Sequence, residues 1–341
     1  MSGPAVRLRT PHELARALPM LLGYQPTESL VVACLQGGQA ALGLTLRFDL
    51  NSLGPLSVAV EEIAARAVRA DADAVLVAVY TDCGFAAGEL PFTELVAELF
   101  DHPDLWVSDA LLIHHGRLWS YLCSGAGCCP ADGVPLAGTT EGLTALESSL
   151  VLSGSAVLAD RSELVASVAV EPTADSPAQR RRMSRARARV AEMAPDRRRR
   201  ELDQLTDRLT RRRQDPRGEV RDAEAALFAA LCGDIGARDD LLLAAGSPQR
   251  LAELLSLLRT VVRRVPPPHD AAICTVLAWF AYASGDGTLA NIALDRALSS
   301  DPTYSLAQLI EAGLDHQLPP RMIQEVVDGA ARDIAARDAA G

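Results

Sequence analysis

One short apolar run constrains the fold of this chain more than any other feature. Residues 74–80 read AVLVAVY, with no charged side chain and a high content of β-branched valine. A run of this length is short for a helix and fits a strand that is buried on both faces. Helical spacing of apolar residues at 55–70 and 92–100 flanks it on either side. We therefore expect a strand within a sheet whose faces are covered by helices.

The rest of the first half fits the same sheet. Thr10 and Gly23 bracket a predicted helix at residues 12–22, as its N-cap and as the glycine after its last turn. Two hairpins are expected, one pairing residues 29–35 with 41–48 and one pairing 105–114 with 117–122. This order of elements predicts an α/β domain at residues 1–170, with a mixed sheet covered by helices.

The composition changes sharply in the middle of the chain. Residues 180–217 hold 15 arginines against six acidic residues, a local net charge of +9 in a chain whose overall charge is −11. We expect two helices here, broken near Pro195, so that residues 171–218 form a linker and an Arg-rich helical arm. All 33 basic residues of the chain are arginines. The lack of lysine excludes Schiff-base catalysis and a P-loop nucleotide site.

Residues 219–341 are expected to form an all-α domain of short antiparallel helices. The helix candidates are residues 219–232, 248–264, 270–283, 288–299, 302–314 and 321–336. Small side chains at Ala278, Ala290 and Ala297 would let two helices approach closely around a turn at Gly285. This pattern resembles one tetratricopeptide repeat, and it predicts a tetratricopeptide-like, helical repeat-like domain. Trp279 and Tyr282 would then pack inside it or, if exposed, line a peptide groove.

Neither a signal peptide nor a membrane span is visible in the sequence. Residues 1–30 lack an apolar core of the kind that a signal peptide needs. The longest apolar stretch, residues 271–283, is too short to cross a bilayer. Seven cysteines is an odd number, which argues against a fully disulfide-paired framework. We expect a cytoplasmic protein that does not contact a membrane.

The stretch CSGAGCCP at residues 123–130 is the most specific chemical feature. Four residues separate Cys123 from Cys128, a spacing within the range of half a zinc knuckle. Cys129 should face away from Cys128, because neighbouring side chains of an extended chain alternate. Further ligands would have to come from Cys83, His102, His114 or His115. Three interpretations stay open: small buried thiols around a tight turn, a zinc site at Cys123, Cys128 and Cys129, or a redox or nucleophilic thiol.

A ligand crevice is expected where the apolar strand ends. Asp82 and Cys83 follow residues 74–80 directly, and the carboxyl ends of crossover strands face the usual crevice of α/β sheets. Asp49, at the end of an earlier strand, has a similar position. The alternative is ordinary turn chemistry, in which Asp82 caps the reversal before Gly84. The sequence contains no dinucleotide, nucleophile-elbow, zinc-protease or P-loop motif.

The Arg-rich segment allows two interpretations. Guanidinium groups suit phosphate, so a cluster of them could bind nucleic acid or another polyanion. The segment lacks interleaved aromatic residues, however, and six acidic residues are mixed into it. We favour a solvated helical arm, or one that docks on acidic residues of the same chain through ion pairs.

Three short motifs resemble those of one protein family. The run LLGYQPTESLVV at residues 21–32 looks like its signature, and Cys123 with residues 128–130 and the run GDGTLA at 285–290 are similar to further marks of it. The family is the domain of unknown function 4192, from the high-GC Gram-positive bacteria (actinobacteria). The resemblance implies a bacterial cytoplasm, and it implies no activity, ligand or catalytic residue.

Three functional hypotheses follow. The one we prefer is a non-enzymatic interaction or adaptor protein that binds another protein through its C-terminal helices, because catalytic motifs are missing. The second is a metal- or thiol-dependent enzyme or sensor that uses Cys123, Cys128 and Cys129, with zinc as the candidate ion. The third is polyanion binding by residues 180–217.

Overall fold

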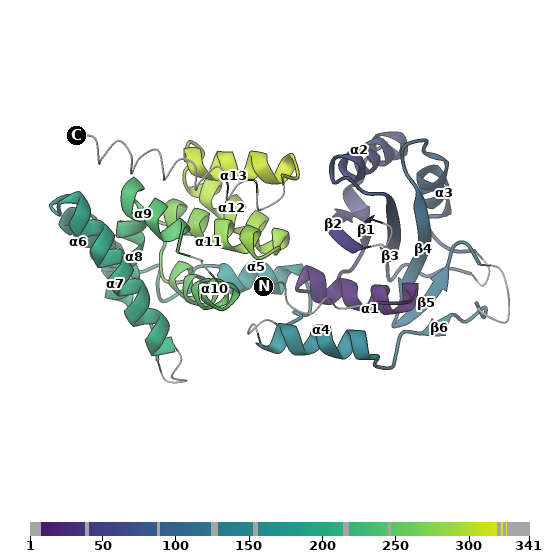
Figure 1. The fold of residues 1–341 in the computed structure, drawn as a ribbon, viewed down its shortest axis with the longest axis horizontal. Coiled ribbons are helices and arrows are strands. Elements are labelled where there is room, and N and C mark those ends of the chain that lie inside the picture. The colour runs from purple at the N-terminus through teal and green to yellow at the C-terminus, as the bar shows by residue number, and fades with distance from the viewer. Residues whose placement is uncertain are drawn as a thin grey trace. The chain divides into compact units, whose positions relative to one another are not determined.

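The computed structural model describes residues 8–37, 41–86, 89–123, 129–152, 156–213, 218–244 and 247–318, together with 322 and 325. The chain forms two compact units, Met1–Arg161 and Ser162–Gly341. Both are drawn in Figure 1. Across the described residues, every helix is too short or too polar to span a bilayer.

The first unit is built on a mixed six-stranded sheet with the order β2-β1-β3-β4-β5-β6. Its strands are β1 (Ser29–Gln36), β2 (Ala41–Asp49), β3 (Ala74–Tyr80), β4 (Val107–His114), β5 (Arg117–Ser120) and β6 (Val134–Pro135). Strands β3 and β4 are parallel, whereas the other neighbours pair antiparallel. The predicted mixed sheet is therefore confirmed. The sequence pattern missed β6, because two residues are too few to show an alternation.

Helices cover both faces of this sheet, as Figure 1 shows. They are α1 (Pro11–Leu22), α2 (Leu56–Arg69), α3 (Thr93–Asp101) and α4 (Glu141–Leu152), with a short 3-10 turn, η1, at Leu50–Ser52. Successive side chains of β3 alternate between the faces: Val77 packs in the core beneath α2 and α3, whereas Tyr80 donates a hydrogen bond to the Ala15 carbonyl of α1. As predicted, Thr10 caps α1, its hydroxyl accepting the Glu13 N–H at 3.1 Å.

The second unit is helical throughout its described part. Its helices are α5 (Arg161–Val168), α6 (Pro177–Ala191), α7 (Pro195–Arg213), α8 (Asp222–Cys232), α9 (Ile235–Leu242), α10 (Pro248–Val262), α11 (Ala271–Ala283), α12 (Gly287–Ser300) and α13 (Ser305–Asp315). Helix α11 is buried almost entirely and packs against α8, α9, α10, α12 and α13. Ala278, Ala290 and Ala297 are fully buried, as a close approach of α11 and α12 requires. The helix predicted at 321–336 lies almost entirely outside the described residues.

The Arg-rich segment belongs to the packing of this second unit. It forms the two helices predicted, α6 and α7, with a break before Pro195. Helix α6 packs on α8, and α7 packs on α8, α9 and α10. Its thin apolar stripe is buried, with Met183, Leu205 and Leu209 each at most 1% exposed. The pattern did not predict α9, an eight-residue helix whose mixed composition gives no clear apolar face.

A buried ion pair ties several helices of the second unit together. Asp270 is 0% exposed, and its carboxylate accepts hydrogen bonds from Arg296 Nε at 2.8 Å and from Ser300 Oγ at 2.6 Å. The same guanidinium donates to the carbonyls of Val262, Val265 and Val168. One side chain of α12 therefore satisfies the ends of α10 and α5 as well as the start of α11.

Candidate functional site

Three strand ends meet at one edge of the sheet. The register pairs Ser29, the first residue of β1, with Tyr80, the last residue of β3. Tyr80 is in turn paired with Ile113 near the end of β4. Residues 23–28, 81–83 and 114–116 therefore gather at the carboxyl ends of the two parallel strands. This is the edge at which ligands bind in α/β sheets.

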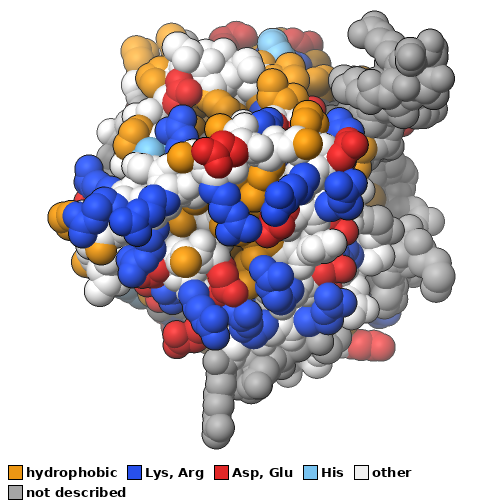
Figure 2. Space-filling view, turned by 90° about the vertical axis from the view of Figure 1, so that its left-hand side faces the viewer, with side chains coloured by type: hydrophobic (Ala, Val, Ile, Leu, Met, Phe, Trp, Pro, Cys, Tyr) orange, Lys and Arg blue, Asp and Glu red, His pale blue; other side chains and the backbone are white. Residues whose placement is uncertain are grey.

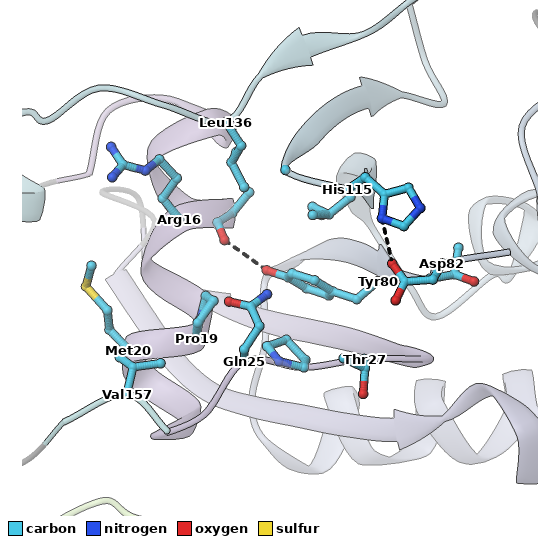
Figure 3. Close-up of a pocket in the computed structure, with 15 residues that line it drawn as sticks. Arg16, Pro19, Met20, Gln25, Thr27, Tyr80, Asp82, His115, Leu136 and Val157 are labelled. Atoms are coloured by element: carbon cyan, nitrogen blue, oxygen red, sulfur yellow. Dashed lines mark hydrogen bonds and ion pairs between the residues drawn. The ribbon is translucent and has the colours of Figure 1, made fainter. Parts of the chain in front are cut away.

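A cavity of about 550 Å³ opens at this edge. Figure 3 shows Arg16 and Met20 of α1 on one side of it, Asp82 and His115 on the other, and the ring of Tyr80 between them. Residues 25–27 line it too, together with apolar side chains of α1, β4 and the loop after β6. A mixture of apolar walls and a few polar groups is typical of a small-molecule site.

Glu28 fixes the chain where it leaves β3. Its carboxylate accepts a hydrogen bond from Thr81 Oγ1, at 2.9 Å to Oε2, and another from the Asp82 N–H, at 2.7 Å to Oε1. Thr81 is 3% exposed, and its hydroxyl also accepts the Cys83 N–H at 3.0 Å. Glu28 itself has a left-handed backbone with φ 40°, a conformation that costs free energy in a residue other than glycine. The position of Asp82 thus depends on a side chain 54 residues earlier.

The remaining residues of the signature run divide into scaffold and cavity wall. Tyr24 is 2% exposed, and the backbone on either side of it exchanges hydrogen bonds of 2.9 Å with Leu158. Ser29 Oγ donates to the Thr27 carbonyl at 2.7 Å and accepts from Arg47 Nε at 2.9 Å. Gln25, Pro26 and Thr27 line the cavity. The run that resembles a family signature therefore builds one wall of the site.

The turn between β4 and β5 brings two imidazoles together. His115 and Gly116 occupy its centre with φ of 46° and 73°, the left-handed pair that a type I′ hairpin requires. Neighbouring side chains of a strand normally point to opposite faces. Here the left-handed backbone at His115 turns its ring back, and the ring centroids of His114 and His115 lie 4.1 Å apart.

Each imidazole contacts the end of β3. His114 Nδ1 lies 2.9 Å from the Thr81 carbonyl, and His115 Nδ1 lies 3.3 Å from Asp82 Oδ1. The Phe85 ring packs edge-on against His114, with centroids 5.1 Å apart, and against Trp119. The ring of His114 is therefore held by one hydrogen bond and by aromatic neighbours, whereas His115 and Asp82 are exposed.

The tyrosine in the cavity wall stays protonated at neutral pH. Burial raises the pKa of Tyr80 well above its usual range, and its hydroxyl donates to the Ala15 carbonyl at 2.8 Å. Burial likewise raises the pKa of Tyr24. Both phenols therefore stay protonated at neutral pH and are not available as bases.

The three residues predicted to line a crevice, Asp82, Cys83 and Asp49, have different positions relative to the cavity. Asp82 lines the cavity. Cys83 is exposed and lies outside the cavity wall. Asp49 is at the same edge of the sheet, but its carboxylate caps η1 by accepting the Asn51 N–H at 3.0 Å and pairs with Arg47 at 3.2 Å. Asp49 thus performs a structural task away from the cavity.

The predicted thiol site falls partly outside the described residues, because Cys128 is among those not described. Cys123 and Cys129 are partly exposed, and the chain after Cys129 is held to β5 by an Arg117–Asp132 ion pair of 2.8 Å. Within the described ranges, neither thiol belongs to a group of three potential metal ligands. A zinc site at Cys123, Cys128 and Cys129 stays a prediction.

Sequence reasoning missed the convergence of Asp82 with His114 and His115, and the role of Glu28. The two histidines were candidates only as distant partners for the thiols. A usable signal exists in the sequence: a His-His-Gly turn follows a strand, and an aspartate follows the neighbouring strand. What the pattern does not show is that these strands are parallel neighbours.

The arginine face of the second unit is a separate candidate. Figure 2 shows basic side chains gathered over α6 and α7. Several arginines are used inside the unit, as in the ion pairs Arg198–Asp234 and Arg212–Glu224, both 2.7 Å. Other arginines of α6 and α7 are exposed and form neither an ion pair nor a side-chain hydrogen bond with a described residue. We call these the arginine face: Arg181, Arg185, Arg197, Arg200, Arg208 and Arg211.

Comparisons with known proteins give a family and no activity. Neither the curated proteins nor the solved structures contain a match to this chain. A family model described as a domain of unknown function, DUF4192, matches residues 11–321, which include the signature run, the strand ends around the cavity and the helices up to α13. The chain therefore belongs to the DUF4192 family.

Proposed function

We propose that the first unit binds a small polar molecule in the cavity at the carboxyl ends of β3 and β4, and that the protein works as a ligand sensor. One observation carries this proposal: the signature run supplies a cavity wall, and its Glu28 holds the adjoining wall at Asp82. If the signature run served only to begin β1, residues 25–27 would have no need to line a cavity.

The polar groups of the cavity indicate the class of ligand. Arg16 is half-buried and forms no ion pair within the described part of the chain. An anionic group of the ligand, a carboxylate or a phosphate, would satisfy its guanidinium. Gln25 and Asp82 could accept hydrogen bonds from hydroxyl or amino groups of the same molecule. The geometry thus favours a small anion that also carries hydrogen-bond donors.

A binding screen with the full chain tests this function. Thermal unfolding is followed with amino acids, hydroxy acids, sugar phosphates and nucleoside monophosphates, and calorimetry follows for each compound that raises the melting temperature. Arg16→Gln should weaken binding of such a compound at least tenfold. Arg66→Gln is the control, because Arg66 pairs with Glu62 on the exposed surface of α2. The absence of saturable binding across the panel, or equal binding by Arg16→Gln, would contradict the proposal.

The adaptor function expected from the C-terminal helices has weaker support. Trp279 is 3% exposed and donates its indole N–H to the Leu242 carbonyl at 3.3 Å, and Tyr282 is 8% exposed. Both aromatic residues therefore serve packing, and neither is free to line a peptide groove. Binding of another protein by residues 219–341, and their tetratricopeptide-like character, remain predictions.

The arginine face supports polyanion binding as a second candidate function. Its six guanidinium groups are exposed, and no described carboxylate neutralises them. Fluorescence anisotropy with a labelled DNA duplex should show an affinity that falls steeply with salt, since each phosphate contact releases counterions. Arg181→Gln with Arg185→Gln should lower the slope of log K against log salt by about 2. Affinity that is independent of salt, or an unchanged slope in this variant, would argue against the function.

A further inference from the structure

We propose that Asp82, His114 and His115 form a binding site for a single transition-metal ion, with Zn²⁺ as the best fit. Among the described residues they are a group in which one potential ligand atom from each lies within 4.8 Å of the others. The inference deepens the proposed function and rests on it in one respect: Asp82 and His115 also line the cavity, so the ion would face the bound molecule.

The backbone brings these three side chains together. Asp82 follows β3 and the histidines close the β4–β5 turn, and the two strands are parallel neighbours that end at the same edge. The left-handed backbone of His115 places both rings on one side. Ligand atoms lie about 2.0–2.2 Å from zinc, so two ligands of one ion are up to about 4 Å apart. Closing the observed spacing needs only small rotations, and Asp82 and His115 are exposed enough to make them.

His114 makes the hydrogen bond that commonly holds a metal-binding histidine. Its Nδ1 faces the Thr81 carbonyl at 2.9 Å, and because a carbonyl can only accept, Nδ1 must carry the proton. The lone pair of the neutral ring is then on Nε2. Metal-binding histidines commonly use the second nitrogen in this way, which fixes the tautomer and the direction of the ring. Thr81 is itself held by Glu28 through its hydroxyl and by the Ile113 carbonyl through its N–H, at 3.2 Å.

The donor set indicates the class of ion. Two imidazoles and a carboxylate suit zinc and other borderline transition metals, whereas Mg²⁺ and Ca²⁺ prefer oxygen ligands throughout. Three protein ligands leave at least one coordination position open, as in catalytic zinc sites. An oxygen of the bound anion could take that position. Zinc would replace the His115–Asp82 contact of 3.3 Å, and any proton carried by His115 would be released to solvent.

Metal binding to the full chain tests the site directly. After EDTA treatment and removal of the chelator, Zn²⁺ is titrated in competition with a chromophoric chelator, and Co²⁺ is used to record ligand-field absorption. We expect one tight site in the wild type. Asp82→Asn, His114→Gln and His115→Asn should each weaken it at least tenfold, in line with the loss of one ligand. Asparagine tolerates a left-handed backbone, so His115→Asn preserves the turn. An unchanged melting temperature in EDTA confirms that each variant folds.

Control variants separate this site from the alternatives. His316→Asn, in the second unit, should leave the affinity unchanged. If Cys123→Ser or Cys129→Ser abolishes the tight site while the Asp82 and histidine variants retain it, the ion belongs to the thiols and the proposal is overturned. It is equally overturned if the wild type binds less than about 0.1 equivalent of Zn²⁺.

The same preparations distinguish failure of the metal site from failure of the cavity function. If a compound of the screen binds in EDTA and is weakened by Arg16→Gln, while Zn²⁺ shows no tight site, the cavity binds a ligand without a metal and the metal site is wrong. If Zn²⁺ binds with the expected pattern of variants while no compound binds, the metal site stands and the ligand-sensor function falls.

Discussion

Replacement of Glu28 should loosen the end of β3 without unfolding the sheet. Its carboxylate accepts two hydrogen bonds, from Thr81 Oγ1 and from the Asp82 N–H. A hydrogen bond to a charged group contributes about 1.5–3 kcal/mol when it is well buried. Glu28 is only half-buried, so we take about 1.5 kcal/mol for each hydrogen bond. The two bonds share one carboxylate, so their combined contribution is taken as somewhat less than the sum. Glu28→Ala should then destabilise this edge by about 2–3 kcal/mol.

The backbone of Glu28 provides a second variant with a different expected result. At φ 40° a residue with a Cβ is strained by about 1 kcal/mol relative to glycine. Glu28→Gly loses the same hydrogen bonds as Glu28→Ala but relieves this strain. It should therefore be the milder of the two substitutions, although alanine is normally the more stabilising residue.

Hydrogen exchange is the suitable assay, because it reports the local opening of single amides, which a melting curve does not resolve. The Asp82 amide is one of the groups that Glu28 binds. A loss of 2–3 kcal/mol corresponds to about 30- to 160-fold faster exchange at that amide. Amides in the middle of β3 should change much less. Unchanged exchange at Asp82 in Glu28→Ala would refute the reasoning, as would a glycine variant that exchanges faster than the alanine variant.

Three further predictions concern other parts of the structure. Gly133→Ala should destabilise the β5–β6 hairpin by about 2 kcal/mol or more in thermal melts, because φ is 72° and a Cβ would lie 2.5 Å from the Trp119 ring. Arg296→Met should cost about 3–5 kcal/mol in urea unfolding, and adding Asp270→Asn should recover part of it, because the single variant strands a buried charge. Burial, with the nearby Arg187, lowers the pKa of His269 below its ordinary 6.5. The unfolded chain then takes up the proton first, so stability is lost as the pH falls from 7.5 to 5.5, and His269→Gln should lose less over that range.

Much of the fold could be predicted from local patterns. The run at residues 74–80 is β3, and the segments with helical spacing on either side are α2 and α3. The break at Pro195 and the cap at Thr10 follow from the chemistry of proline and of threonine. Where the pattern is too short or too mixed, prediction fails, and β6 and α9 were missed for that reason.

The site was only partly predictable, because it depends on pairings between distant residues. The rule that ligands bind at strand ends selected Asp82, and this residue lines the cavity in the structure. The same rule selected Asp49 and Cys83, but it does not say which way the chain turns after a strand. Asp49 turns into η1 and caps it. The bond from Glu28 to residue 82 and the reversal of the ring at His115 are set by tertiary structure and have no local signature.

The link from Glu28 to the end of β3 has a mechanical consequence. Residues 25–27 touch whatever fills the cavity, and the next residue in the chain holds the hydroxyl of Thr81 and the amide of Asp82. The carbonyl of the same threonine orients His114. A shift of residues 25–27 on ligand binding would thus move Glu28, and through it Thr81, whose carbonyl orients the His114 ring. Binding of a ligand in the cavity should therefore change the affinity of the protein for the metal ion, and binding of the ion should change the affinity for the ligand by the same factor.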